Sequence, residues 1–315
     1  MIDVKFLTRY YGKTPAVQDV SFSISERQIV GLLGHNGAGK TTVMKMLSGY
    51  LEPSAGSVEI GGKDLSLDAR EIQQSLGYLP ENLPIYPEMT IADYLDYAAQ
   101  LKGLRGDKKR RAIRYSVDAT ELGARFFDPI GQLSRGFKQR VGVAQAILGE
   151  PELLILDEPG NGLDPQQNEH MRELVQELSR QATVILSTHV MQEVDALCER
   201  VLVLSNGALA LDSPLAVLRE SRELLLSCSS DTGDMANLLS RLPQIAHVSM
   251  LDDTGNKLTL SLALKESAAM DTAAGNVSRM VIDSGAKLYS LTPLRRNLEQ
   301  IFREAVREKG GSHGS

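Results

Sequence analysis

Residues 34–42 read Gly-His-Asn-Gly-Ala-Gly-Lys-Thr-Thr, and this segment constrains the fold more than any other part of the chain. An apolar run, Ile29 to Leu33, precedes it, and apolar residues at helical spacing follow from Val43. The loop glycines allow a tight turn whose backbone N–H groups all point inward, and the N-terminal end of a following helix adds its positive dipole. A strand, a glycine loop and a helix in this order predict a nucleoside triphosphate site in an α/β fold.

Two side chains of the loop have a chemistry of their own. Lys40 can reach the outer phosphates, and the Thr41 hydroxyl can take one coordination position on Mg²⁺. The competing interpretation is a glycine-rich turn that happens to carry a lysine and a threonine. The strand before the loop and the helix after it favour phosphate binding.

A second motif places two acids after a run of four apolar residues, Leu153 to Leu156. Such a run is typical of a buried parallel strand, which delivers the next residue to the carboxyl edge of the sheet, where α/β sites lie. Asp157 can hold Mg²⁺ directly or through water, and Glu158 can polarise a water for attack on the γ-phosphate. The alternative is a common Asp-Glu-Pro turn at a strand end.

Two further segments point to anion binding when they are taken with the first two. Ser134 and Gly136 stand at a predicted helix start and offer a hydroxyl and free N–H groups, although alone they would be an ordinary N-cap. His189 follows another predicted strand, 183–186, so its side chain would emerge beside the γ-phosphate. A lone histidine in such a place is more often structural or simply exposed.

Taken in order, these segments resemble the ATPase family of ABC transporters, from residue 1 to about 220. Within that resemblance Tyr11 matches the residue on which adenine stacks, and Glu81 stands where the family usually has a glutamine that senses Mg²⁺ and the membrane partner. Residues 162–165 match the dimer-contact loop. The resemblance assigns nucleotide binding to Tyr11, Gly34, His35, Asn36, Gly37, Ala38, Gly39, Lys40, Thr41, Thr42, Ser134 and Gly136. It assigns catalysis to Glu158, His189 and Lys40, and Mg²⁺ binding to Thr41, Glu81 and Asp157.

The family resemblance also implies partners. Two chains would pack head to tail as a homodimer, and each ATP would lie between Lys40 of one chain and the Ser134–Gly136 segment of the other. Separate transmembrane permease subunits would complete the transporter. Residues 83–87 are the candidate contact with the permease, and a proline-stiffened loop that packs on its own domain is the equal alternative.

Three positions depart from the family pattern. Glu81 replaces glutamine and adds a charge near Mg²⁺, Arg135 replaces the first glycine of the signature segment, and Gly160 replaces a hydroxyl residue and is interpreted as tolerated. The first two resemble the exporter branch that includes gliding-motility and multidrug export cassettes. Export is therefore expected, with import as the alternative.

Composition limits the other possibilities. Lys and Arg number 34 against 40 Asp and Glu, a net charge of −6 that shows no global nucleic-acid footprint. No apolar stretch approaches the roughly 18 residues of a membrane span, and no N-terminal signal pattern is present. Cys198 and Cys228 match no metal spacing and are expected to be buried free thiols. We expect a cytoplasmic protein that is peripheral on the inner face of the membrane.

The predicted architecture has two folded parts. Residues 1–220 form the α/β ABC nucleotide-binding domain, with a helical subdomain at about 88–150. Residues 221–308 follow the order β-α-β-β-α-β of a ferredoxin-like unit, with a regulatory, dimerising or docking role, and residues 309–315 form a disordered tail.

Two other classes of function are weaker. A soluble ABC ATPase acting on DNA or ribosomes would be expected to show a long coiled-coil insertion, zinc ligands or a second cassette, and none is visible. A nucleotide-gated scaffold without turnover is disfavoured by the presence of Glu158 and His189.

Overall fold

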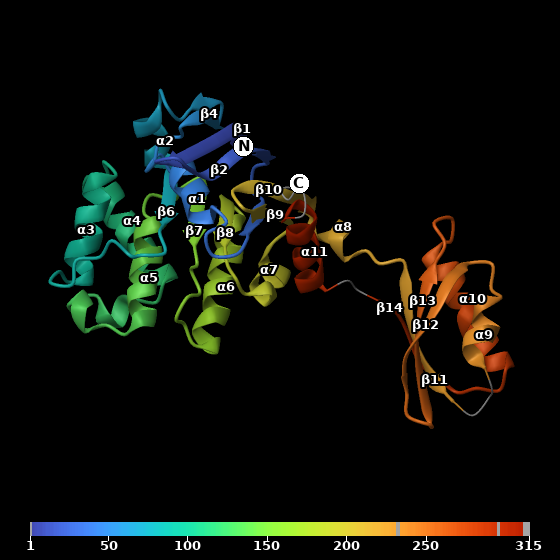
Figure 1. Ribbon diagram of the computed structural model, residues 1–315. Coiled ribbons are helices and arrows are strands. Elements are labelled where there is room, and N and C mark those ends of the chain that lie inside the picture. The colour runs from blue at the N-terminus through green and yellow to red at the C-terminus, as the bar shows by residue number, and fades with distance from the viewer. Residues whose placement is uncertain (1, 231–233, 295–296, 311–315) are drawn as a thin grey trace. The chain divides into compact units, whose positions relative to one another are not determined.

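A computed structural model describes residues 2–230, 234–294 and 297–310 (Figure 1). The chain separates into two compact units. The first runs to Leu215 and also includes the chain from Phe302 onward, and the second is Ala216–Ile301. This division places the end of the last helix in the first unit. It therefore does not test the predicted domain limits at 220 and 308, which stay predictions.

The centre of the first unit is a sheet of six strands in the order β10-β9-β3-β8-β7-β6, of which β9 to β6 run parallel and β10 is an antiparallel edge. Every residue of the three central strands is buried. This explains their unbroken apolar sequences, since helices cover both faces of such sheets. The strands are β3 (Ile29–Leu33), β6 (Leu76–Leu79), β7 (Leu153–Asp157), β8 (Thr183–Ser187), β9 (Arg200–Ser205) and β10 (Ala208–Pro214).

A second, antiparallel sheet lies over the helix that follows β3. Its strands are β1 (Ile2–Tyr11), β2 (Thr14–Ile24), β4 (Ala55–Ile60) and β5 (Lys63–Asp64), followed by helix α2 (Ala69–Ser75). The main core is formed by side chains of both sheets and of helix α1 (Lys40–Leu47), on which Val43, Met44, Met46 and Leu47 are buried. The helix after the glycine loop is thus clamped between two sheets, which fixes its N-terminal end.

Helices interrupt the α/β pattern between β6 and β7, in the region predicted for the helical subdomain. They are α3 (Ile91–Leu101), α4 (Gly106–Ala119), two short 3₁₀ turns (Gly123–Arg125 and Ile130–Gln132) and α5 (Arg135–Ala146). Thr90 caps α3 by accepting a hydrogen bond from the Asp93 N–H. These helices have a core of their own, to which the buried face of α5 contributes. Helices α6 (Pro165–Ser179), α7 (Met191–Leu197) and α8 (Leu215–Arg219) complete the unit.

The second unit has the predicted order β-α-β-β-α-β. Its antiparallel sheet has the order β12-β13-β11-β14, in which the first and third strands form the centre, and its core holds side chains of both helices. The elements are β11 (Glu223–Ser229), α9 (Met235–Ser240), β12 (Ile245–Asp253), β13 (Lys257–Leu264), α10 (Met270–Asp283) and β14 (Leu288–Pro293). The ferredoxin-like prediction is confirmed.

The last helix, α11 (Leu298–Gly310), takes in the first two residues of the predicted disordered tail, and residues 311–315 lie outside the described residues. Cys198 and Cys228 are buried free thiols, as expected. In the described part of the chain no helix is both long enough and apolar enough to cross a membrane.

Candidate nucleotide-binding and hydrolysis site

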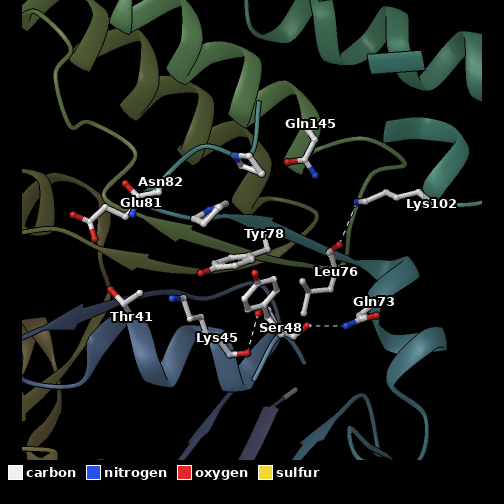
Figure 2. Close-up of a pocket in the computed structure, with 13 residues that line it drawn as sticks. Thr41, Lys45, Ser48, Gln73, Leu76, Tyr78, Glu81, Asn82, Lys102 and Gln145 are labelled. Carbon is white, nitrogen blue, oxygen red and sulfur yellow. Dashed lines mark hydrogen bonds between the residues drawn. The ribbon is translucent and has the colours of Figure 1, made fainter. Parts of the chain in front are cut away.

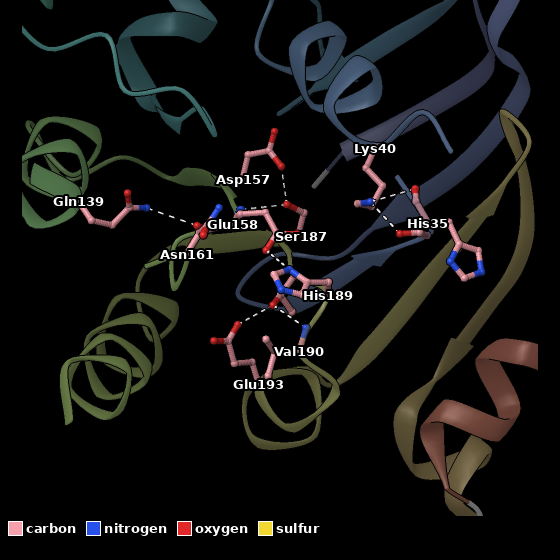
Figure 3. Close-up of polar contacts among 12 residues, drawn as sticks. His35, Lys40, Gln139, Asp157, Glu158, Asn161, Ser187, His189, Val190 and Glu193 are labelled. Atoms are coloured by element: carbon pink, nitrogen blue, oxygen red, sulfur yellow. Dashed lines mark hydrogen bonds and ion pairs between the residues drawn. The ribbon is translucent and has the colours of Figure 1, made fainter. Parts of the chain in front are cut away.

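The glycine loop connects β3 to α1 at the carboxyl edge of the parallel sheet. Gly39 precedes α1 with φ 106°, and a Cβ atom there would lie 2.7 Å from the Ala16 carbonyl oxygen, so only glycine fits. The Lys40 amine is held within the loop, where Nζ donates to the carbonyl oxygens of Gly34 at 2.7 Å and His35 at 3.2 Å (Figure 3). The His35 ring meets the Phe302 ring edge to face, with centroids 5.0 Å apart.

Two neighbouring strands bring a serine against the first acid. Asp157 ends β7 and pairs with Ser187, the last residue of β8. The Ser187 hydroxyl donates to Asp157 Oδ1 at 2.5 Å, while in the described residues nothing donates to Oδ2, although this atom is buried. A buried carboxylate oxygen without a donor is costly unless a cation or water takes it. This oxygen fits Mg²⁺, a hard cation that prefers oxygen ligands.

The second acid is held at both its backbone and its side chain. Glu158 has φ 53°, in the left-handed region that is strained for a residue with a side chain. Its N–H donates to the Ser187 hydroxyl at 3.0 Å and to the Ser187 carbonyl at 3.2 Å. Its carboxylate Oε2 lies 2.8 Å from Nδ1 of His189 (Figure 3). The Glu158 side chain is only 14% exposed, whereas that of His189 is 68% exposed, so the histidine orients the carboxylate from the solvent side.

The loop after Glu158 is packed against a buried acid that sequence reasoning missed. Glu193 on α7 accepts a hydrogen bond from the Thr188 hydroxyl at 2.6 Å. A Cβ atom at Gly160 would lie 2.5 Å from Glu193 Oε1 and 2.8 Å from Asn168 Oδ1. The carboxylate thus fills the space that a side chain at 160 would need. A side chain at 160 would have to displace these two oxygens, so Gly160 matches its surroundings.

The second predicted anion cradle lies at the N-terminus of α5. The Ser134 hydroxyl accepts a hydrogen bond from the Phe137 N–H at 3.4 Å, and the serine is exposed. Gly136 is buried beneath Gln167, whose Oε1 would lie 2.4 Å from a Cβ at this position. Over the described ranges no hydrogen bond joins Ser134 or Gly136 to the glycine loop. The two predicted anion-binding segments therefore belong to different elements of the chain, the start of α5 and the start of α1.

The remaining predicted residues lie around these groups. The Tyr11 side chain is exposed, and the Arg9 guanidinium lies 5.3 Å from the centroid of its ring. Thr41 and Glu81 line one end of a cleft of about 450 Å³ (Figure 2). Tyr78 lines the same cleft, and burial, with a smaller contribution from the charge of Asp157, raises the pKa of its phenol. Thr41 and Glu81 thus share a cleft, as joint Mg²⁺ binding would require.

Sequence reasoning found the loop, the acids and the histidine, because each lies in a contiguous motif. It did not find the role of Ser187, which bonds both acids from the next strand. The one available signal was that Ser187 ends the strand before His189. It also missed Gln139, whose Nε2 donates to the Glu158 carbonyl at 3.4 Å.

This arrangement defines the class of the protein. The glycine loop follows β3, the acid pair follows β7, and β8 lies between these two strands in the sheet. This arrangement is the nucleotide site of a P-loop ATPase.

Comparison with known proteins identifies the family. A model of the ABC transporter family matches residues 17–161. The linearmycin resistance ATP-binding protein LnrL of Bacillus subtilis is 30% identical over 313 residues, 96% of this chain and 97% of that protein. The bacitracin transport ATP-binding protein BcrA of Bacillus licheniformis is 30% identical over 98% of this chain and 97% of its own length. A solved ATP-binding subunit of an ABC transporter, 31% identical, superposes with a TM-score of 0.64 over 69% of this chain and 91% of its own.

The chain belongs to the family of ABC transporter ATP-binding proteins, and it is an ATPase subunit of that class. The family predicted from the motifs is confirmed.

Proposed function

We propose that this chain binds and hydrolyses ATP in a head-to-tail homodimer that drives export through separate transmembrane subunits. The observation that supports the dimer is that the two predicted anion-binding segments lie on different elements of the chain. Lys40 stands at one edge of the sheet and Ser134 at the exposed N-terminus of α5, and no hydrogen bond between described residues joins them. We infer that one nucleotide meets both segments when two chains supply them.

In this proposal each residue of the site has its own role. Lys40 and the loop N–H groups hold the phosphates, and the Tyr11 ring stacks on the base. Thr41, Glu81 and Asp157 would hold Mg²⁺, which would neutralise charge on the phosphates. Glu158 accepts a proton from the attacking water, because its carboxylate is largely shielded from solvent and oriented by His189 at 2.8 Å.

Export is favoured by two full-length relatives. LnrL is named for resistance to linearmycin and BcrA for transport of bacitracin, and this chain matches nearly all of each. We infer a similar role at the cytoplasmic face of the membrane, in which residues 83–87 contact the permease. Tyr86 supports this contact by its exposure of 45%, and its packing against Tyr94 and Tyr97 of α3 holds the loop in place. The second unit is a candidate for association with the sister chain or the permease.

A mixing experiment tests the shared site. Ser134→Arg in one chain and Lys40→Ala in the other leave one composite site intact and one doubly damaged. Each variant alone should be inactive, and an equimolar mixture should recover ATPase activity. The controls are each variant at the same total concentration. An inactive mixture in which mixed dimers are demonstrated by affinity-tag co-purification would contradict the shared site.

A further inference from the structure

Arg135 lies between the two residues of the second anion cradle, but its side chain turns back onto its own chain. Its Nη2 donates to Asn161 Oδ1 at 2.8 Å. Gly162 makes room for this contact: its φ is 82°, and a Cβ there would lie 2.3 Å from Arg135 Nε. The Arg135 side chain in this conformation leaves no room for a Cβ at 162, so the two positions are matched.

The contact continues to Glu158 through the backbone. The Asn161 N–H donates to the Glu158 carbonyl at 3.1 Å, and the Gln139 side chain donates to the same oxygen at 3.4 Å. Gln139 lies one helical turn after Arg135 and is buried. One face of the start of α5 therefore holds the loop that follows the catalytic acid.

Glu158 needs such support, because its left-handed backbone is strained. Ser187 holds its N–H, and the α5 face holds its carbonyl. A shift of α5 would therefore move the Glu158 backbone, because these hydrogen bonds connect the two.

We propose that Arg135 is a positioning residue that couples the two ATP sites of the dimer. Ser134 and Gly136 contact the nucleotide that the partner chain holds. When these two residues move, Arg135 moves with them and shifts Glu158 of its own chain through Asn161. This inference rests on the proposed shared-site dimer. The alternative is that Arg135 acts across the interface, by contacting the phosphates of the nucleotide that Ser134 binds.

The mixed dimer separates these two roles. The parent pair is a Ser134→Arg chain, which supplies Lys40 and Glu158 to the intact site, and a Lys40→Ala chain, which supplies the Ser134 segment. Arg135→Gly is added to the first chain in one arm and to the second chain in the other. Both arms contain the same set of substitutions and differ only in which chain carries Arg135→Gly.

Positioning in the same chain predicts that kcat of the first arm falls about tenfold below that of the second, the scale of one lost charged hydrogen bond. KM for ATP should stay similar in both arms, because the phosphate contacts are kept. Asn161→Ala on the first chain should reproduce the loss, and adding it to Arg135→Gly should cost little more. Thermal unfolding of each variant controls for the fold.

Equal losses in the two arms, or a larger loss in the second, would overturn the proposal. A larger second-arm loss with raised KM would assign Arg135 to the nucleotide across the interface. An inactive parent pair would instead overturn the shared-site dimer, so the two failures are distinguishable.

Discussion

Lys102 should make the stability of the first unit depend on alkaline pH. Its side chain lines one side of the cleft of Figure 2, and its amine donates to three carbonyl oxygens, those of Leu76 at 3.2 Å, Ala146 at 3.4 Å and Leu148 at 2.9 Å. It thereby links the end of α3 to the start of β6 and the end of α5. Burial lowers the pKa of Lys102 from 10.5 to about 8.

The sign and size of the effect follow from proton linkage. Below about pH 8 both the folded and the unfolded chain hold the proton, so burial of the charge costs its full amount of about 3 kcal/mol. Between about pH 8 and 10.5 only the unfolded chain holds it, so the free energy of unfolding rises with pH through this window. Above 10.5 the contribution levels off.

The test compares wild type with Lys102→Met by urea unfolding at pH 7 and pH 10. Methionine removes the donor to three carbonyls at both pH values, so the quantity of interest is the change with pH. Wild type should gain about 2–3 kcal/mol relative to the variant between the two pH values. Lys108→Met, at an exposed position of α4, is the matched control and should follow wild type. If Lys102→Met shows the same pH dependence as wild type, the reasoning is wrong.

Two further predictions concern residues around the acids. Ser187→Ala removes the donor to Asp157 Oδ1 and one acceptor of the Glu158 N–H, so steady-state kcat should fall at least about tenfold; wild-type kcat would refute the orienting role. Gly160→Ser forces an atom to within 2.5 Å of Glu193 Oε1, so the melting temperature should fall by about 4 °C or more. Adding Glu193→Ala should recover part of this loss, and failure to do so would place the strain elsewhere.

Local motifs were enough to predict much of the fold. The glycine loop is one contiguous segment between a strand and a helix, and the run before Asp157 reads as a buried strand because all of its residues are apolar. In the second unit, the order of the elements was predicted from the sequence, and the structure has the same order. Such features are local, so periodicity reveals them.

Contacts between distant segments could not be read in this way. Arg135 and Asn161 are 26 positions apart, and nothing near either residue indicates that the guanidinium turns back along its own chain. Glu193 reads as an ordinary helix residue, yet it fills the space beside Gly160. Lys102 reads as a solvated lysine after a helix, yet its amine donates to three carbonyl groups of two other segments. These roles depend on how the elements pack, which sequence spacing does not specify.

We propose that ATP is held between two chains and that Glu158 is needed only to hydrolyse it. Sedimentation velocity of Glu158→Gln with and without saturating Mg-ATP tests this directly. We expect a monomer without nucleotide, a stable dimer with it and almost no hydrolysis, since Lys40 and Asp157 remain to hold the nucleotide. Glu158→Gln combined with Lys40→Ala should remain monomeric. A Glu158→Gln protein that stays monomeric in saturating Mg-ATP, or that hydrolyses ATP at the wild-type rate, would contradict this proposal.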